Sequence, residues 1–160
     1  MIDYANNKVK FDGCPGCAYA KGQFSLPCEL IYQDEDFTVS QDWELPIPGF
    51  IVVCPVRKHV ERLCELDDET VSKMFLIVKK IENILRKNNV AEEFNIVAEE
   101  KPNIHYHIWI MPKREWMFNI HESSMARIEE LFDYAKSKFK NKETFDEIER
   151  IAHLLREELK

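Results

Sequence analysis

Residues 104–113 read IHYHIWIMPK, and this stretch decides the fold. Apolar and polar side chains alternate along it, as in a β-strand whose successive side chains point to opposite faces of a sheet. The isoleucines and the tyrosine share one face, which predicts a buried core strand. His105, His107 and Trp109 share the other face, so the two imidazoles can reach one metal ion or one substrate group.

This histidine pair is the first candidate for catalysis. A neutral imidazole presents one lone pair, and a hydrogen bond at its other nitrogen fixes the ring. It can therefore attack phosphorus and divide one displacement into two through a covalent phosphoramidate. A lone histidine on a strand is more often a satisfied side chain without a function, but His105 and His107 lie on the same face, which favours chemistry.

The segments around this strand predict a mixed fold. Short β-type runs lie at residues 28–32, 37–40, 50–54 and 94–98, the first two around a turn at residues 33–36. Helical periodicity follows Asp67 or Asp68 as N-cap and stops at residues 87–89, and it returns at 128–139. A last helix is predicted from Thr144, where TFDE forms a capping box. This order favours an antiparallel α+β domain over a βαβ repeat.

Composition limits the function classes. The chain has 160 residues, 22 Lys and Arg against 29 Asp and Glu, and a net charge of −7. The size predicts a single core, and the charge argues against non-specific binding of nucleic acid. No run is long and apolar enough to predict a membrane span, and the N-terminus shows no signal peptide. We therefore expect a cytoplasmic protein that binds neither nucleic acid nor membrane.

The five cysteines are an odd number without an export signal, which argues against a disulfide framework. Cys14 and Cys17 enclose Pro-Gly, which we interpret as a tight turn that aims both thiols inward. With His59 and His105 available, a Cys2His2 zinc site is the favoured interpretation. A redox pair would need a helix start within a thioredoxin-like βαβ unit, which the sequence does not indicate. Two thiols buried by chance are the remaining alternative.

Taken in order, residues 14–113 resemble the histidine triad (HIT) superfamily, in particular its zinc-bearing bacterial members. The matching pieces are CPGC at 14–17 with Gly22, IYQDEDF at 31–37, Asp42 followed by Pro48 and Gly49, VVCP at 52–55 leading to His59, and HYHIWIMPK at 105–113. The resemblance implies an antiparallel sheet with helices on one face, a homodimer, and a nucleotide cleaved or transferred at its α-phosphate. It also implies a HIT-like domain over residues 1–113, with residues 114–160 as a C-terminal helical extension packed on the same domain.

The resemblance assigns roles to individual residues. His107 corresponds to the nucleophile, with His105 beside it, and Asp42 to the residue that contacts the ribose hydroxyls. The zinc ligands correspond to Cys14, Cys17, His59 and His105. The walls of the base pocket correspond to Ile31, Phe37 and Trp43.

The sequence also departs from the family pattern. The third triad histidine is replaced by Trp109, which we expect to pack and to form a stacking wall. The usual polar phosphate contacts are replaced by residues 99–103, EEKPN, where Lys101 or backbone N–H groups would hold the phosphate oxygens. Glu99 is expected in a solvated turn; the alternative is a carboxylate near His107, which would repel phosphate. The sequence thus predicts a nucleotidyl hydrolase or transferase with a degenerate triad. The alternatives are a zinc-stabilised nucleotide-binding or interaction module with little or no turnover, and a metal or thiol redox protein.

Overall fold

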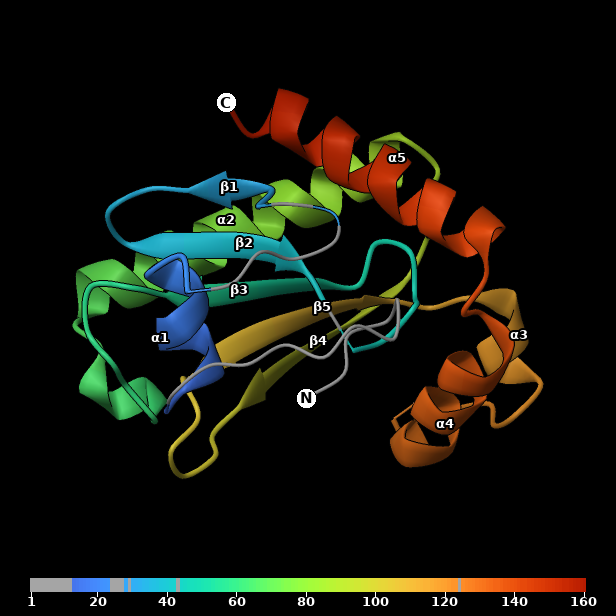
Figure 1. Ribbon diagram of the computed structural model, residues 1–160, viewed down its shortest axis with the longest axis horizontal. Coiled ribbons are helices and arrows are strands. Elements are labelled where there is room, and N and C mark those ends of the chain that lie inside the picture. Colours follow the sequence, from blue (N-terminus) through green and yellow to red (C-terminus); the bar gives the residue numbers. More distant parts are fainter. Residues whose placement is uncertain (1–12, 24–27, 29, 43, 124) are drawn as a thin grey trace.

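The computed structural model describes residues 13–23, 28, 30–42, 44–123 and 125–160. Within these residues the strands form a five-stranded antiparallel sheet in the order β1-β2-β3-β5-β4 (Figure 1). The strands are β1 Tyr32–Gln33, β2 Phe37–Gln41, β3 Ile51–Pro55, β4 Phe94–Glu99 and β5 His107–Pro112. The helices are α1 Pro15–Ala20, α2 Asp68–Lys87, α3 Glu115–Phe118, α4 Ile128–Lys138 and α5 Lys142–Glu158, with a 3-10 turn at Leu63–Glu65. The predicted α+β class, with an antiparallel sheet and C-terminal helices, is confirmed.

One face of the sheet is apolar because alternate residues of the central strands point to it. The register pairs Val39 with Val53 and Ile51 with Ile110, so these side chains share that face. Helices α2 and α5 pack against it, and Figure 1 shows α2 behind the sheet. Their buried residues form the main core with the strands: Met74, Val78, Ile81, Ile84, Leu85, Ile148, Ile151, Ala152 and Leu155. Because Ile108 and Ile110 of β5 point into this core, His107 and Trp109 point to the other face.

Helix α2 follows the sequence prediction at both ends. Asp67 is its N-cap, and the Asp67 carboxylate accepts a hydrogen bond from the Thr70 backbone N–H at 2.8 Å. Asn88 follows as C-cap, and Arg86 and Lys87 lie in the last turn, where they face the negative end of the helix dipole. The capping residues and the apolar stripe therefore indicate the same helix bounds, which is why the sequence could locate this helix.

The opposite face of the sheet is partly covered, by α1 at one end and by a second apolar cluster at the other (Figure 1). This second cluster joins the loop after β2 to the end of β5 and to α3 and α4. Its buried members are Leu45, Ile47, Phe50, Met111, Met117, Leu131 and Ala135. The C-terminal segment thus contacts both faces: α5 contributes to the main core, and α4 lies at one end of the open face. The rest of that face remains available for a site.

Several local expectations are corrected. The strand begins at His107 and not at Ile104, because the Tyr106 N–H donates to the Val60 carbonyl at 2.7 Å and so joins a loop. Helix α5 begins before Thr144, because the Asn141 side chain caps it and accepts from the Thr144 N–H at 3.0 Å. Strand β1 begins at Tyr32, whereas the sequence predicted a strand over residues 28–32.

The Pro-Gly between the cysteines is helical and not an isolated tight turn. Pro15 occupies the first turn of α1, where a missing N–H costs nothing, and Cys14 is the N-cap. The short helix α3 was not anticipated from sequence. Among the described helices, none combines the length and the hydropathy needed to cross a bilayer.

Candidate functional site

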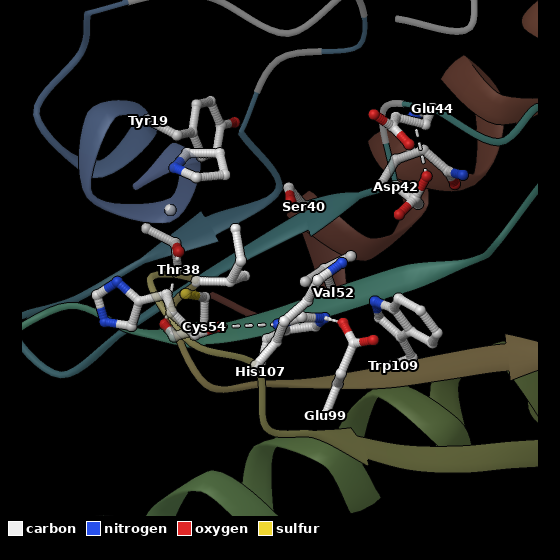
Figure 2. Close-up of a pocket in the computed structure, with 16 residues that line it drawn as sticks. Tyr19, Thr38, Ser40, Asp42, Glu44, Val52, Cys54, Glu99, His107 and Trp109 are labelled. Carbon is white, nitrogen blue, oxygen red and sulfur yellow. Dashed lines mark hydrogen bonds and ion pairs between the residues drawn. The ribbon is translucent and has the colours of Figure 1, made fainter. Parts of the chain in front are cut away.

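The open face of the sheet forms the floor of a cavity of about 310 Å³ (Figure 2). Alternate residues of the strands line the floor, and α1 and the loop after β2 form the walls. The residues around the cavity are Pro15, Gly16, Tyr19, Thr38, Ser40, Gln41, Asp42, Glu44, Val52, Cys54, Glu99, Lys101, Ile104, His105, His107 and Trp109. The cavity therefore combines polar and apolar side chains on its floor with titratable groups from several separate segments.

Helix α1 approaches the histidine segment closely because residue 16 is a glycine. A Cβ added to Gly16 would lie 2.9 Å from the Cβ of His105 and 3.2 Å from the Sγ of Cys54. These separations are too short for carbon and sulfur atoms in van der Waals contact. Gly16 thus allows α1 to carry its two flanking thiols up to His105.

Four side chains converge at this end of the cavity: Cys14, Cys17, His59 and His105. Their potential ligand atoms all lie within 4.8 Å of one another. The Cys17 Sγ is 3.4 Å from the His59 Nδ1 and 3.3 Å from the His105 Nδ1, and the Cys14 Sγ is 3.8 Å from the His105 Nδ1. The structure thus brings together all four residues that the sequence suggested as metal ligands.

The donor set fits zinc. A tetrahedral ion with Zn–S near 2.3 Å and Zn–N near 2.0 Å requires ligand atoms about 3.3–3.8 Å apart. The His105 Nε2 is 3.1 Å from the Lys58 carbonyl, and the His59 Nε2 is 3.5 Å from the Glu61 carboxylate. If these Nε2 atoms carry the ring protons, both Nδ1 atoms are free to bind a metal, an arrangement typical of histidine ligands.

The electrostatics of the cluster favour a neutral imidazole. Burial lowers the pKa of His105 to about 4, so its ring is uncharged at neutral pH, as a metal ligand must be. Burial, together with the neighbouring Cys14, raises the pKa of the Cys17 thiol, so a bound cation would be needed to stabilise two thiolates side by side.

The cysteine pair does lie at a helix start, contrary to the sequence interpretation. However, α1 is not flanked by parallel strands in the part of the chain that the structure describes, where all strand pairs are antiparallel. The two histidines facing the thiols distinguish the cluster further from a dithiol redox centre. The geometry therefore favours a metal over a redox pair.

His107 lies next along the floor, at the start of β5. Its Nδ1 is 2.8 Å from the carbonyl oxygen of His105, which accepts a hydrogen bond from an Nδ1–H tautomer. Its Nε2 is then the lone-pair nitrogen, and it lies 3.3 Å from a carboxylate oxygen of Glu99. Figure 2 shows the Glu99 and His107 side chains meeting in the cavity. The His105 carbonyl thus orients the His107 ring at Nδ1, and the Glu99 carboxyl contacts it at Nε2.

Trp109 occupies the floor beyond His107, and the two ring centroids are 5.4 Å apart. Its indole packs edge-on against Phe50 at 5.6 Å and against Phe132 of α4 at 5.9 Å. Edge-to-face pairs at such distances are favourable. The position that a third imidazole would take is therefore part of an aromatic cluster, which we define as Phe50, Trp109 and Phe132.

Asp42 lies at the same end of the cavity and is buried. One carboxylate oxygen accepts hydrogen bonds from the Glu44 and Leu45 N–H groups, both at 2.9 Å. Burial nevertheless raises the pKa of Asp42 to about 7. The carboxyl thus loses its proton close to neutral pH. Lys101 is exposed at the rim.

A family model for the HIT domain matches residues 23–116. The chain belongs to the HIT family. An uncharacterized HIT-like protein from Methanocaldococcus jannaschii is 28% identical over 101 residues, which cover 59% of this chain and 76% of the relative.

Solved HIT structures share the fold. A zinc-bound histidine triad family protein from Mycobacterium smegmatis superposes with a TM-score of 0.64 at 22% identity, covering 91% of this chain and 92% of that one. A hypothetical histidine triad nucleotide-binding protein from Sulfolobus tokodaii gives 0.61 at 19% identity and covers 91% of both chains. Membership of the HIT family supports nucleotide binding with hydrolase- or transferase-like chemistry as the general function.

Two residues expected to form base-pocket walls in this HIT domain lie elsewhere. Ile31 and Phe37 are buried in the main core with α2 and α5, and neither lines the cavity. Phe37 alternates with Thr38 and shares the face of Val39, which directs it to the core. Trp43, the third expected wall, lies outside the described residues.

The sequence favoured the wrong position for Glu99 and did not show what Phe132 covers. Glu99 is not in a solvated turn but is the last residue of β4, directly opposite His107 in the register. The signal was present, because antiparallel pairing of two adjacent strands brings such residues to the same face. Phe132 had no comparable signal, since a helical stripe does not reveal which surface it covers.

Proposed function

We propose that this HIT protein binds a nucleotide or a nucleotide conjugate in the cavity and acts at its α-phosphate through His107. The observation that carries the proposal is the orientation of this imidazole. The hydrogen bond from Nδ1–H to the His105 carbonyl leaves Nε2 as the nucleophile, facing a cavity of about 310 Å³. A neutral, fixed imidazole is the form required for attack on phosphorus.

The reaction has two displacements. The Nε2 lone pair of His107 attacks the α-phosphorus, and the bond to the leaving group breaks. Water, or an acceptor in a transfer reaction, then displaces His107 and regenerates the free imidazole. Hydrolysis thus releases a nucleoside monophosphate, and transfer moves the nucleotidyl group to the acceptor.

The remaining cavity residues have binding roles in this proposal. Asp42 accepts hydrogen bonds from the ribose hydroxyls, and its position at the end of the cavity away from the cysteines supports this role. Lys101 at the rim holds the phosphate oxygens. Trp109 offers the edge of an indole as a wall, and His105 acts beside His107 by holding its ring through the main-chain carbonyl.

We further propose that Cys14, Cys17, His59 and His105 hold a structural zinc ion. When bound, zinc supplies the positive charge that stabilises the two thiolates and crosslinks α1 to the segment before β5. His105 would then be held at its imidazole, and its carbonyl is the group that orients His107. The structural site would therefore support the nucleophile without contacting the substrate.

A second candidate is a nucleotide-binding module with little or no turnover. Two observations favour it: Trp109 stands at the third triad position, and the Glu99 carboxylate lies 3.3 Å from the His107 Nε2, where an anionic phosphate must approach. The two candidates differ in whether bound nucleotide conjugates are cleaved.

The test is turnover by the purified, zinc-loaded protein on nucleoside phosphoramidates and dinucleoside polyphosphates. We expect release of nucleoside monophosphate, and its loss in His107→Ala, with a fall of at least about 10³-fold. An alkaline quench should preserve one nucleotidyl group on the wild-type chain in intact-mass spectra. His153→Ala, which removes an exposed imidazole on α5, should retain activity. Nucleotide binding without turnover would instead establish the second candidate.

We also propose the division into a HIT-like domain over 1–113 and an extension over 114–160, and a homodimer in the cytoplasm. The edge position of β4 and the 40% exposure of Ile96 support pairing with a second copy. The net charge of −7 supports a small-molecule partner over nucleic acid. A solution mass twice that of the chain is the expected result for the dimer.

A further inference from the structure

We infer that Glu99 is the general acid and base of this site, serving the leaving group and then the attacking water in place of a third triad histidine. The inference rests on the proposed nucleotidyl chemistry of His107. It starts from the 3.3 Å contact between the Glu99 carboxyl and the His107 Nε2. It makes Glu99 a catalytic residue, because the carboxyl contacts the reacting atoms.

The fold places Glu99 there by register. Glu99 on β4 pairs directly with His107 on β5, so both side chains leave the sheet on the cavity face. The His107 side chain is 11% exposed, whereas that of Glu99 is 36% exposed. The imidazole is thus held, while the carboxyl at the rim can turn toward an incoming group. In an in-line displacement the leaving atom lies across the phosphorus from Nε2. The proposal therefore requires the partly exposed Glu99 side chain to turn from Nε2 toward that atom.

The neighbouring groups explain why an acid is needed at this point. Trp109 stands where the third imidazole would be, and an indole N–H donates a hydrogen bond but does not deliver a proton and take it back. Its ring is also engaged by Phe50 and Phe132. Lys101 at the rim supplies charge for the phosphate. The carboxyl of Glu99 is able to complete a proton cycle.

Over the two displacements, Glu99 gives up one proton and takes one back. At the start the Nδ1–H of His107 bonds to the His105 carbonyl, and one further proton lies between Nε2 and the Glu99 carboxyl; in the proposed cycle Glu99 holds this proton when Nε2 attacks. When Nε2 bonds to phosphorus, the bond from phosphorus to the leaving oxygen or nitrogen breaks, and Glu99 gives its proton to that atom. The Glu99 carboxylate then takes a proton from water as the water oxygen bonds to phosphorus. The electron pair of the breaking P–N bond returns to Nε2, and both residues regain their starting forms.

This role predicts dependence on the leaving group. A p-nitrophenolate departs as a stable anion and needs no proton, whereas an alkylamine departs from phosphorus only when it is protonated. A general acid contributes about 10²- to 10⁴-fold where the proton is needed. Removing it should therefore affect one substrate class and spare the other.

The experiment compares wild type, Glu99→Gln and Glu100→Gln on the p-nitrophenyl ester and the alkylamidate of the same nucleoside monophosphate. We expect Glu99→Gln to lose about 10²- to 10⁴-fold on the amidate and less than about 5-fold on the ester. Glu100→Gln is the matched control: it removes the same charge, lies outside the cavity lining, and keeps an oxygen to accept from the Leu63 N–H. If the Glu99→Gln chain does not fold, Glu99→Ala with added formate replaces it, and formate should restore amidate cleavage.

Other outcomes overturn the inference. Equal loss on both substrates would reduce Glu99 to a positioning residue, and faster turnover of both would show that its carboxylate blocks Nε2. If the wild-type protein cleaves the ester in a His107-dependent way while Glu99→Gln cleaves both substrates normally, only the role of Glu99 fails. If the wild-type protein cleaves neither substrate, the proposed function fails and this inference fails with it.

Discussion

The two ends of the cavity floor are built by different forces. At one end, Cys14, Cys17, His59 and His105 place four ligand atoms within 4.8 Å of one another. At the other end, the aromatic cluster is packed by α4 and the loop after β2. His107 lies between them, with its Nδ1 bonded to the carbonyl of the metal end and its ring 5.4 Å from the Trp109 of the aromatic end. The nucleophile is thus supported by an ion-binding cluster on one side and by apolar packing on the other.

The largest effect is expected from breaking the metal end. The Cys14→Ser/Cys17→Ser double variant should lose zinc, and its free energy of unfolding should fall by about 4–5 kcal/mol, because the crosslink between distant segments is lost. Metal analysis and urea unfolding measure the two quantities. Cys64→Ser removes an exposed thiol outside the cluster and should change neither. A double variant that retains one zinc per chain would refute the ligand assignment.

The next effect concerns a buried charge at the aromatic end. Burial raises the pKa of Asp42 to about 7 from the 3.8 of an unfolded chain. Ionisation therefore lowers stability as the pH rises from about 4 to 7, and the full loss is present above pH 7. Asp42→Asn keeps an oxygen for the Glu44 and Leu45 N–H groups.

We expect this variant to match wild type at pH 4 and to be more stable by about 2–3 kcal/mol at pH 8, as measured by urea unfolding across this range. Asp133→Asn, on the exposed side of α4, should show no such trend. A difference between Asp42→Asn and wild type that stays constant with pH would mean that the carboxyl ionises normally.

The smallest expected change in stability comes from the aromatic end, and it tests whether that end is independent of the metal end. Phe132→Ala removes a half-buried ring from Phe50 and Trp109 and should lower the free energy of unfolding by about 2 kcal/mol, because a cavity is left. Zinc content should not change. Phe75→Ala, whose ring is 47% exposed on α2, should cost less than about 0.5 kcal/mol. Loss of zinc from Phe132→Ala would show that the two ends are coupled.

The same contrast separates what sequence could predict from what it could not. The strands around residues 37–40 and 50–54 and helix α2 follow from local alternation, periodicity and capping, which depend on neighbours in the chain. The four residues of the metal end were found because Cys14 and Cys17 form a pair with a short, informative spacing and match a family pattern. For the strands, the helix and the cysteine pair, the deciding information lies close together in the sequence. His59 and His105 lie 42 and 88 positions from Cys17, and only their residue type and the family pattern linked them to the pair.

The aromatic end depends on contacts that the sequence does not mark. The apolar stripe of α4 was visible, but nothing in it indicated that Phe132 would cover Trp109 and not the main core. Alternation along β2 separates Phe37 and Val39 from Thr38 and Ser40, but it does not show which of these faces borders the cavity, and both are buried. The pairing register of the strands decides which face borders the cavity, and this register depends on the whole sheet. The position of Glu99 opposite His107 has the same origin.

The contact between Cys14 and His105 also has a consequence for the order of events during biosynthesis. The His105 backbone N–H lies 3.2 Å from the Cys14 Sγ, although the two residues are 91 positions apart in the chain. Cys14 and Cys17 leave the ribosome before their partners at residues 59 and 105. The cluster is therefore completed only after His105 has been made, and until then the two thiols are open to any metal or oxidant that the nascent chain meets.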